Sequence, residues 1–493
     1  MGFYEKLQSI VGADYVSDSP DVCRSYAYNT FITHRYSKPP EYVCQPQTTE
    51  QVSEVVKLCN QFKVPVTPKG LTAGTGNGGF HHGGVLLDLM YMDKILEVDP
   101  VNMKAVAEAG ASFFKLSQEV FKAGMMLPTT EYSCGPSVAA SVLTPVVAIG
   151  KTRYGRNCDL VEGFEVVLPT GEICRVGSMA YADTEFGPFY RYIHGPDLIG
   201  LFVMANGAMG IVTKVAYACQ KKPPYWGYKG MYWTQEDIYR MQEYVMEVSA
   251  MEFYDVHVCD RWKTEMAVCD PTGTPHPELH PVLKDAPSEA FFLVYNTATA
   301  YSQEELDAKL NQLDRLRDKH QGHEMGPALM ASMFTLFPSH HTPSVGSNKL
   351  MKPAYDMNRS NYHFIYDSIN YPTSRLADVY LRIKESCEKY GFWGYPRCTV
   401  FDCFPMRSQT CCSQTWAYLN TRDEKQMEEL FACREDFRDW FGQAGGTHQQ
   451  HFYPIVGEYM WANQKSDYEL LKVIKKAIDP NNIMSPATYE LEV

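Results

Sequence analysis

The sequence predicts an α+β protein of more than one domain, and three observations carry this prediction. Strand-like and helix-like segments alternate over the first 222 residues. After Pro223 the pattern changes to four strand-then-helix units, which is typical of an antiparallel sheet covered by helices on one side. The 493-residue chain is 45% hydrophobic and 21% charged, the composition of a globular protein with large cores.

A glycine-rich stretch, residues 64–89, lies between two apolar runs of strand character. Glycine adopts positive φ and exposes its backbone N–H, and consecutive N–H groups form a concave site for phosphate. Gly74, Gly76 and Gly79 match the GxGxxG pattern of a Rossmann turn, but an apolar strand at 85–89 follows where that turn would begin a helix. The stretch therefore predicts a phosphate cradle of another fold, built as strand, loop and strand.

The elements around this stretch follow from caps and periodicity. A capping box at residues 48–51 predicts a helix before the first strand, and Ser112 begins a second helix that Gly124 ends. Residues 132–155 show neither helical nor strand period and almost no charge, so a buried flat cofactor would satisfy their backbone. A hairpin is expected at 163–176, and a strand begins at Gly210.

The second half of the chain supplies the four strand-then-helix units, and the chain closes with one more helix. The strands are expected at 228–233, 291–298, 362–369 and 416–420, each followed by a helix. Ser466 and Glu469 predict the cap of the last helix, which Asp479 and Pro480 end.

Charge and cysteine usage exclude several classes of partner. A net charge of -13 argues against nucleic acid or an anionic membrane as the main partner. No stretch approaches the length of a membrane span, and without a signal-peptide pattern a cytoplasmic location is expected. The 15 cysteines lack paired CxxC spacing, so no zinc or iron–sulfur site is predicted. The vicinal pair Cys411 and Cys412 is read as two idle thiols or as a redox pair.

Four segments together resemble one family. PKGLTAGTGNGG with GGVLLDL resembles a pyrophosphate loop, LVEGFEVVLPTGE and NGAMGIVTK resemble flavin-side segments, and DPNNIMSP resembles a C-terminal DPNGIMNPG. These motifs resemble the FAD-linked oxidases with the vanillyl-alcohol oxidase and p-cresol methylhydroxylase (PCMH-type) fold. The resemblance covers residues 46–218 and the last 50 residues.

The resemblance implies an FAD-binding domain formed by residues 1–222 and 443–493, with an inserted cap or substrate domain at 223–442. It also implies FAD as the cofactor. His81 and His82, beside the glycine-rich loop, are interpreted as a polar turn or as a point of covalent attachment of the flavin. The residues expected to contact FAD are Lys69, Gly70, Leu71, Thr72, Ala73, Gly74, Thr75, Gly76, Asn77, Gly78, Gly150, Thr152, Gly155, Gly210, Ile211 and Val212.

The expected catalytic residues lie in two segments, TRYGR and HQQH, and are Tyr154, Arg156, His448, Gln449 and His451. Where the phenol-oxidising branch has an Asp after Tyr-Gly, this chain has Arg156, which cannot act as a base. Arg156 is expected to bind a substrate carboxylate or a developing anion, and a salt bridge within the protein is the alternative. That branch also has a Tyr-Arg pair where this chain has His448 and Gln449.

The resemblance implies an FAD-dependent oxidoreductase that transfers a hydride from a small alcohol or phenol-type substrate, with or without a carboxylate, to flavin N5. Oxygen or a redox protein would accept the electrons, and a homo-oligomer is expected. The 2-hydroxy-acid dehydrogenases of this family have a metal-binding pattern like GDGNxH in the cap and EHG near the end. Neither is present, since the second position reads GGTHQQH, so no metal is predicted. Two alternatives stay open: a 2-hydroxy-acid dehydrogenase that passes electrons to a partner protein, and a flavin-binding electron-transfer subunit without turnover.

Overall fold

The computed structural model divides the chain into two compact units. The first contains residues 1–146, 157–221 and 451–493, and the second contains 147–156 and 222–450. The predicted domain boundaries at 222/223 and 442/443 stay predictions. The residues that the structure describes are 2–26, 38–71, 82–128, 136–143, 149–263, 287–327, 329–330, 362–393, 400–407, 409–420, 423–448, 460–486 and 488–491.

The first unit has two main sheets in its described part. The order of one is β1 (Val16–Ser17), β2 (Tyr42–Cys44), β4 (Val85–Asp88), β3 (Val66–Lys69). The order of the other, which is antiparallel, is β5 (Ile95–Asp99), β6 (Lys104–Glu108), β10 (Ile211–Ala218), β8 (Val161–Val167), β9 (Ile173–Gly177). A short ribbon pairs β7 (Met125–Met126) with β11 (Gln220–Lys221).

The helices of the first unit pack around these sheets. Its α-helices are α1 (Phe3–Val11), α2 (Pro20–Tyr26), α3 (Thr49–Phe62), α4 (Phe113–Lys122), α5 (Val138–Leu143), α7 (Ile199–Phe202) and α17 (Lys465–Ile478). Its 3-10 turns are η1 (Ala13–Tyr15), η3 (Asn157–Leu160), η4 (Ser178–Tyr181) and η7 (Thr488–Glu490).

Local signals explain where these helices begin. The Thr48 hydroxyl accepts from the Gln51 N–H at 3.2 Å, and Ser112 caps α4 in the same way through the Lys115 N–H. The N-terminal cap predicted at Ser466 for the last helix is wrong, because α17 begins at Lys465 and no side chain caps its first turn. The expectation of irregular backbone over 132–155 was also wrong in part, since α5 and α6 (Lys151–Tyr154) form there.

The glycine-rich stretch follows the predicted order of strand, loop and strand. β3 and β4 lie side by side and parallel, with Val66 opposite Val85. The C-terminal segment then adds to the outer edge of β3, because the Val66 N–H donates to Ile483 O at 2.8 Å and the Ser485 N–H donates to Val66 O at 2.9 Å. Segments far apart in sequence thus meet along β3, whose last residue, Lys69, leads into the glycine-rich loop.

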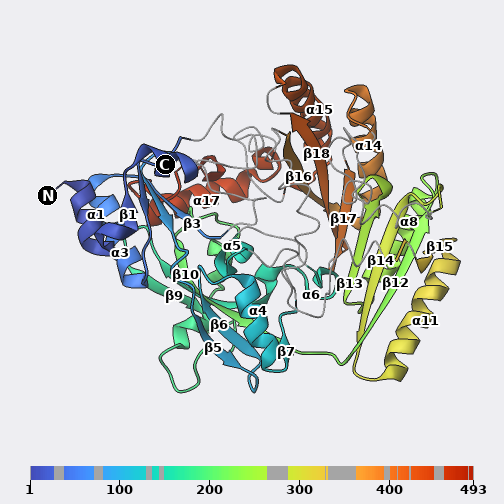
Figure 1. The fold of residues 1–493 in the computed structure, drawn as a ribbon, viewed down its shortest axis with the longest axis horizontal. Helices are drawn as coiled ribbons and strands as arrows, with labels where there is room; N and C mark the ends of the chain where they lie inside the picture. Colours follow the sequence, from blue (N-terminus) through green and yellow to red (C-terminus); the bar gives the residue numbers. More distant parts are fainter. Residues whose placement is uncertain are drawn as a thin grey trace. The chain divides into compact units, whose positions relative to one another are not determined.

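The second unit is built on an antiparallel sheet of eight described strands. Their order is β15 (His323–Glu324), β12 (Tyr225–Trp233), β14 (Phe292–Ala300), β13 (Asp255–Asp260), β17 (Val400–Met406), β18 (Thr410–Asn420), β16 (Tyr362–Pro372), β19 (Thr447–His448). Four helices follow strands as predicted and cover one face (Figure 1): α8 (Ile238–Ser249), α11 (Gln303–Lys319), α14 (Leu376–Lys389) and α15 (Glu424–Gln443). The turn η6 (Thr373–Arg375) precedes α14. The α+β fold class with an antiparallel, helix-covered sheet is confirmed.

Strand alternation gives this sheet two chemically different faces. On the helix-covered face, aromatic rings pack against the helices, as Trp233 does against Tyr244 of α8 and Phe292 against Tyr380 of α14. We call the opposite side the polar face. It carries Asp255, His257, Asp402, Phe404, Cys412, Asn370 and Thr447, whose register pairs place them on one side.

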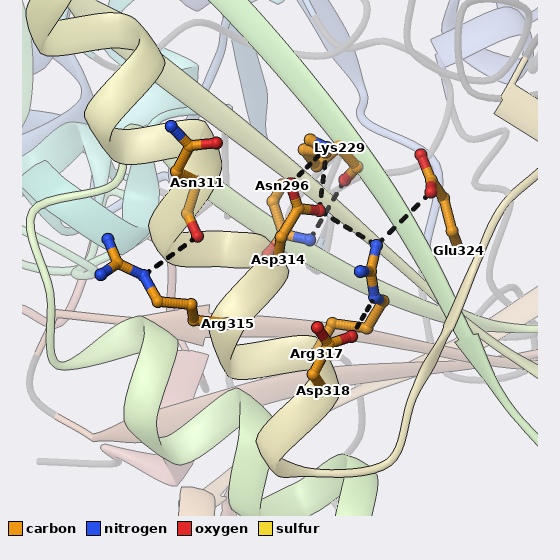
Figure 2. A network of polar contacts seen from close by, with 8 residues as sticks. All are labelled: Lys229, Asn296, Asn311, Asp314, Arg315, Arg317, Asp318 and Glu324. Carbon is orange, nitrogen blue, oxygen red and sulfur yellow. Dashed lines mark hydrogen bonds and ion pairs between the residues drawn. The ribbon is translucent and has the colours of Figure 1, made fainter.

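A charged network fastens α11 to the helix-covered face (Figure 2). Lys229 of β12 contacts Asp314 at 2.8 Å, and Asp314 also accepts from Arg317 at 3.0 Å. Arg317 reaches Glu324 of β15 at 3.5 Å. These groups are partly exposed, so each pair contributes little to stability, and they lie on the side of the sheet opposite the polar face.

Candidate functional site

In the first unit, the residues at the carboxyl end of β3 are tightly packed. A Cβ added at Gly70 would lie 2.3 Å from Ser137 Oγ and 3.3 Å from Ala140 Cβ, so a larger residue fits there only if the Ser137 side chain moves. The Ser137 N–H donates to Leu71 O at 2.8 Å, which joins the start of the loop to the N-terminal end of α5. The remaining predicted loop residues, Thr72 to Gly78, and His81 lie outside the described residues.

A turn before β10 meets the same end of β3. Gly207 has φ 80°, and a Cβ added to it would lie 2.5 Å from Pro68 Cγ. Asn206 Nδ2 donates to Tyr489 OH at 2.8 Å, so the C-terminal segment is hydrogen-bonded to this turn. The turn leads through Gly210, where an added Cβ would lie 2.8 Å from Val166 Cγ1, into β10, where Ile211 and Val212 pair with β8.

Buried polar groups on β3, on α5 and in the C-terminal segment fit a polar cofactor. Thr67 Oγ1, Ser141 Oγ and Ser485 Oγ are buried and have no hydrogen-bond partner among the described residues. Burying a hydroxyl without a partner costs free energy, so these groups suit a ligand that supplies donors and acceptors. Together with the close approach at Gly70 and Gly207, they make this end of β3 a fitting cradle for the phosphate-bearing part of a dinucleotide.

Lys69 supplies a cation at the same end of β3. Its ammonium lies 4.5 Å from the centre of the Tyr26 ring, and the Tyr26 hydroxyl donates to Asp88 at 2.8 Å. Burial lowers the pKa of Lys69, while Asp88 opposes this effect.

In the second unit, the one-turn helix α6 lies on the polar face and carries several predicted residues. Gly150 and Gly155 bracket it with φ 91° and 85°, the left-handed region that glycine adopts most easily. Lys151 Nζ contacts the Asp255 carboxylate at 2.8 Å, and the Gly150 N–H donates to the same carboxylate at 3.2 Å. Burial raises the pKa of Asp255, and the Lys151 charge opposes this shift.

Thr152 was predicted to contact the cofactor, but its hydroxyl is used within the sheet. It accepts from the Val256 N–H at 2.9 Å and donates to Pro405 O at 2.9 Å. The side chain is 1% exposed, so it links α6 to β13 and β17 rather than reaching outward.

A second buried charge group lies beside this helix. His257 Nε2 is 2.5 Å from Asp402, and Lys263 Nζ contacts the same carboxylate at 3.1 Å. Burial alone would raise the pKa of Asp402, but Lys263 and His257 lower it to about 2. Burial lowers the pKa of His257 even though Asp402 opposes it.

Arg156 lies on the polar face, next to β16. Its guanidinium donates to Asn370 Oδ1 at 2.5 Å, and Asn370 is paired in the sheet with Thr447. Cys412 lies opposite Asn370, and burial raises the pKa of its thiol to about 11, against the effect of Arg156. Cys411 points to the other face because the two cysteines are neighbours on one strand, so the vicinal pair is separated by the sheet.

The other predicted catalytic residues are placed differently. The Tyr154 ring packs edge-on against Tyr254 at 6.3 Å between ring centres, and burial raises the pKa of its hydroxyl. His448 pairs with Ile369 and packs against Phe441 of α15, on the helix-covered face. The structure therefore does not bring His448 to the face that holds Arg156. Gln449 and His451 lie outside the described residues.

The residues that sequence reasoning missed are the buried charges of the polar face. Asp255, His257 and Asp402 lie on β13 and β17, neither of which was predicted. A signal was present, because DVHVCD at 255–260 alternates polar and apolar residues as a strand does. Lys151 was not among the predicted site residues, although it is the first charge after a long apolar segment.

Asp260 provides a test of the buried charges through pH. It accepts from the backbone N–H groups of Lys263 and Phe401, and burial raises its pKa to about 8. Because its pKa in the folded protein lies above the unfolded value, the contribution of Asp260 to stability is complete below about pH 4 and is lost as pH rises toward 8. The free energy of unfolding, measured with urea from pH 4 to 8, should therefore fall less steeply for Asp260→Asn than for the wild type. Parallel curves would contradict the raised pKa.

Among the described residues, no group of three or more His, Cys, Asp or Glu side chains could hold a metal ion. None of the described helices combines the length and apolar character that crossing a membrane requires.

Two family models match the chain. "FAD binding domain" matches residues 40–177, and "FAD linked oxidases, C-terminal domain" matches residues 240–489. The solved structure of p-cresol methylhydroxylase with substrate bound has a TM-score of 0.84 and 20% identity, covering 99% of this chain and 96% of that one.

Among characterised relatives, the "Glycolate oxidase subunit GlcD" of Bacillus subtilis (strain 168) is 22% identical over 498 residues, covering 98% of this chain and 95% of that protein. The D-lactate dehydrogenase of Anaerostipes hadrus is 33% identical over 177 residues, 36% of this chain and 35% of that protein. The 4-cresol dehydrogenase flavoprotein subunit of Pseudomonas putida is 29% identical over 225 residues. The chain spans only 35% and 42% of the lengths of the last two relatives.

Proposed function

Because the chain belongs to the FAD-linked oxidases, it is a flavoprotein oxidoreductase with FAD as its cofactor, and we propose that it oxidises a carboxylate-bearing alcohol. FAD, when bound, supplies the redox chemistry by accepting a hydride. The residues of this chain would bind the cofactor, orient the substrate and handle the substrate's proton.

The first unit would hold the cofactor at the carboxyl end of β3. Gly70 and Gly207 let the backbone approach closely there, and the hydroxyls of Thr67, Ser141 and Ser485 are buried and open to new hydrogen bonds. The predicted loop residues from Lys69 to Gly78 continue from this point, and their N–H groups would hold a pyrophosphate.

Arg156 is the single observation that carries the choice of substrate. It puts a guanidinium on the polar face, where Asn370 orients it through a 2.5 Å hydrogen bond. A guanidinium pairs with a carboxylate through two parallel hydrogen bonds, which a lysine or a neutral side chain cannot reproduce. It stays protonated and so cannot remove the substrate's proton.

The proton of the substrate hydroxyl needs another acceptor. Burial raises the pKa of Tyr154, which keeps its hydroxyl protonated and suits it to donating a hydrogen bond. His448 lies on the helix-covered face, which favours His451 among the histidines named from sequence. This role for His451 stays a prediction.

The names of two relatives favour 2-hydroxy acids as the first class of substrate to test, because lactate and glycolate are both small 2-hydroxy acids. The 4-cresol dehydrogenase relative keeps phenols as the second class. We further propose that the acceptor of electrons is oxygen or a redox protein, that the protein is cytoplasmic and that it assembles as a homo-oligomer.

Anaerobic reduction of the flavin tests this proposal. The purified protein is mixed in turn with glycolate, lactate, 2-hydroxyglutarate, benzyl alcohol and p-cresol, and flavin absorbance is followed. We expect hydroxy acids to bleach the flavin. Bleaching by p-cresol alone would assign the phenol class, and no bleaching by any compound would favour a subunit without turnover. Chelator treatment should leave the rate unchanged, and a loss would point to a metal-dependent 2-hydroxy-acid dehydrogenase.

A further inference from the structure

The hydrogen bonding between β13 and β17 changes at Pro405. The two strands pair at Val258 with Cys403 and at Cys259 with Asp402. Continued in the same antiparallel register, Val256 would face Pro405. Proline has no backbone N–H, so this position cannot form the usual double hydrogen bond of an antiparallel pair.

The Thr152 hydroxyl occupies this position in the ladder. The Val256 N–H donates to Thr152 Oγ1, and Thr152 Oγ1 donates to Pro405 O, both at 2.9 Å. One hydroxyl thus satisfies the two backbone groups and joins α6 to two strands. Serine or threonine can do this, and valine, which has the same shape as threonine, cannot.

A second attachment holds the other end of the same helical turn. Asp255 accepts from both Lys151 Nζ and the Gly150 N–H. Lys151 is 0% exposed and Asp255 is 3% exposed. A buried ion pair contributes little net stability because both charges lose their hydration, so stability alone is a weak reason for its presence.

Arg156 follows directly from this fixed helical turn. The Gly155 N–H donates to Lys151 O at 2.9 Å, which closes the turn and sets the direction in which the chain leaves it. The next residue is Arg156, whose guanidinium reaches Asn370 on β16. The helical turn that leads to Arg156 is therefore held from β13 and β17, and the Arg156 side chain is held from β16.

We infer that Thr152 and Asp255 are positioning residues that fix Arg156 for binding the substrate carboxylate. This inference rests on the proposed function, because it assigns Arg156 to that carboxylate. Thr152 acts through the Pro405 position of the sheet, and Asp255 acts through Lys151 and Gly150.

The test compares Thr152→Val with Thr152→Ser in the full-length flavoprotein. The probe is oxalate, an unreactive dicarboxylate, and its Kd is read from the perturbation of flavin absorbance. Displacing a binding group by about 1 Å costs up to roughly 100-fold, so we expect Thr152→Val to weaken oxalate binding by roughly 10- to 100-fold. We expect Thr152→Ser to stay within about twofold of the wild type, because it keeps the hydroxyl that bridges the two backbone groups. KM for a hydroxy acid should rise in parallel, with a smaller change in kcat.

Two further measurements separate positioning from a general loss of structure. Amide hydrogen exchange at Val256 should speed up in Thr152→Val and return to the wild-type rate in Thr152→Ser. Ser249→Ala, which removes another buried hydroxyl on the helix-covered side, should leave oxalate binding unchanged. If Thr152→Val does not fold, Thr152→Ala and Asp255→Asn serve in the same comparison.

The double variant Thr152→Val/Arg156→Ala distinguishes the possible failures. If positioning is correct, adding Thr152→Val to Arg156→Ala should weaken oxalate binding no further. Normal oxalate binding by Thr152→Val, when Arg156→Ala has lost it, would overturn the positioning role and leave the proposed function standing. Normal binding by Arg156→Ala would overturn both.

Discussion

Arg156→Ala is expected to raise KM for a carboxylate substrate by about 30-fold or more. Charged hydrogen bonds of this kind contribute about 2 kcal/mol, and each 1.4 kcal/mol corresponds to a factor of ten. Steady-state kinetics with a 2-hydroxy acid would measure the change. Substrates without a carboxylate should show a much smaller effect, because they do not use the guanidinium.

Arg156→Lys is the matched control, since it keeps the positive charge and loses the planar pair of donors. It should recover part of the affinity but not all of it. Unchanged KM in Arg156→Ala, with a normal unfolding transition, would make Arg156 part of the scaffold and would remove the main reason for choosing a carboxylate substrate.

Asp255→Ala is expected to lower the free energy of unfolding by about 3–5 kcal/mol. It removes the carboxylate that the fully buried Lys151 contacts at 2.8 Å, and removing one partner of a buried ion pair is strongly destabilising. Unfolding in urea, followed by circular dichroism, would measure the loss.

Asp93→Ala is the surface counterpart, because Asp93 contacts Lys115 at 2.9 Å with both side chains about half exposed. Its cost should stay below about 1 kcal/mol. Replacing both partners, as Lys151→Met/Asp255→Leu, should cost less than Asp255→Ala alone, because no charge is left in the interior. Equal effects of Asp255→Ala and Asp93→Ala would show that Asp255 is not buried as described.

The parts of the fold that local signals specify were predictable from sequence. Caps at Thr48 and Ser112 mark helices that form as predicted. The glycine-rich stretch identified its flanking strands because glycine and apolar runs differ so strongly in composition. The cap predicted at Ser466 is wrong because the last helix begins one residue earlier, at Lys465, without a side-chain cap.

Of the two strands of the polar face that were not predicted, β17 breaks the usual strand pattern for a physical reason. β17 contains Asp402 and Pro405, which are both unfavourable within a sheet. Each is accommodated by a partner distant in sequence, Asp402 by His257 and Lys263, and Pro405 by the Thr152 hydroxyl. Such compensation depends on contacts that no local pattern encodes.

Of the polar face, only Arg156 could be identified from the sequence alone. Arg156 stood out because a guanidinium occupies a position where a base was expected. The pairing of Lys151 with Asp255 spans 104 residues, so only the fold reveals it. The side of the sheet on which His448 lies depends on strand register, because a shift of one residue reverses the face.

A matched pair of substrates tests whether Arg156 selects a carboxylate. Anaerobic stopped-flow reduction of the flavin is measured with lactate and with 2-propanol, which carry the same secondary alcohol and differ in the carboxylate. We predict that lactate reduces the flavin at least about 30-fold more efficiently, in line with one charged pair of about 2 kcal/mol, and that Arg156→Ala removes most of this preference. Equal reduction by both alcohols, or a preference for lactate that survives in Arg156→Ala, would contradict carboxylate binding by Arg156.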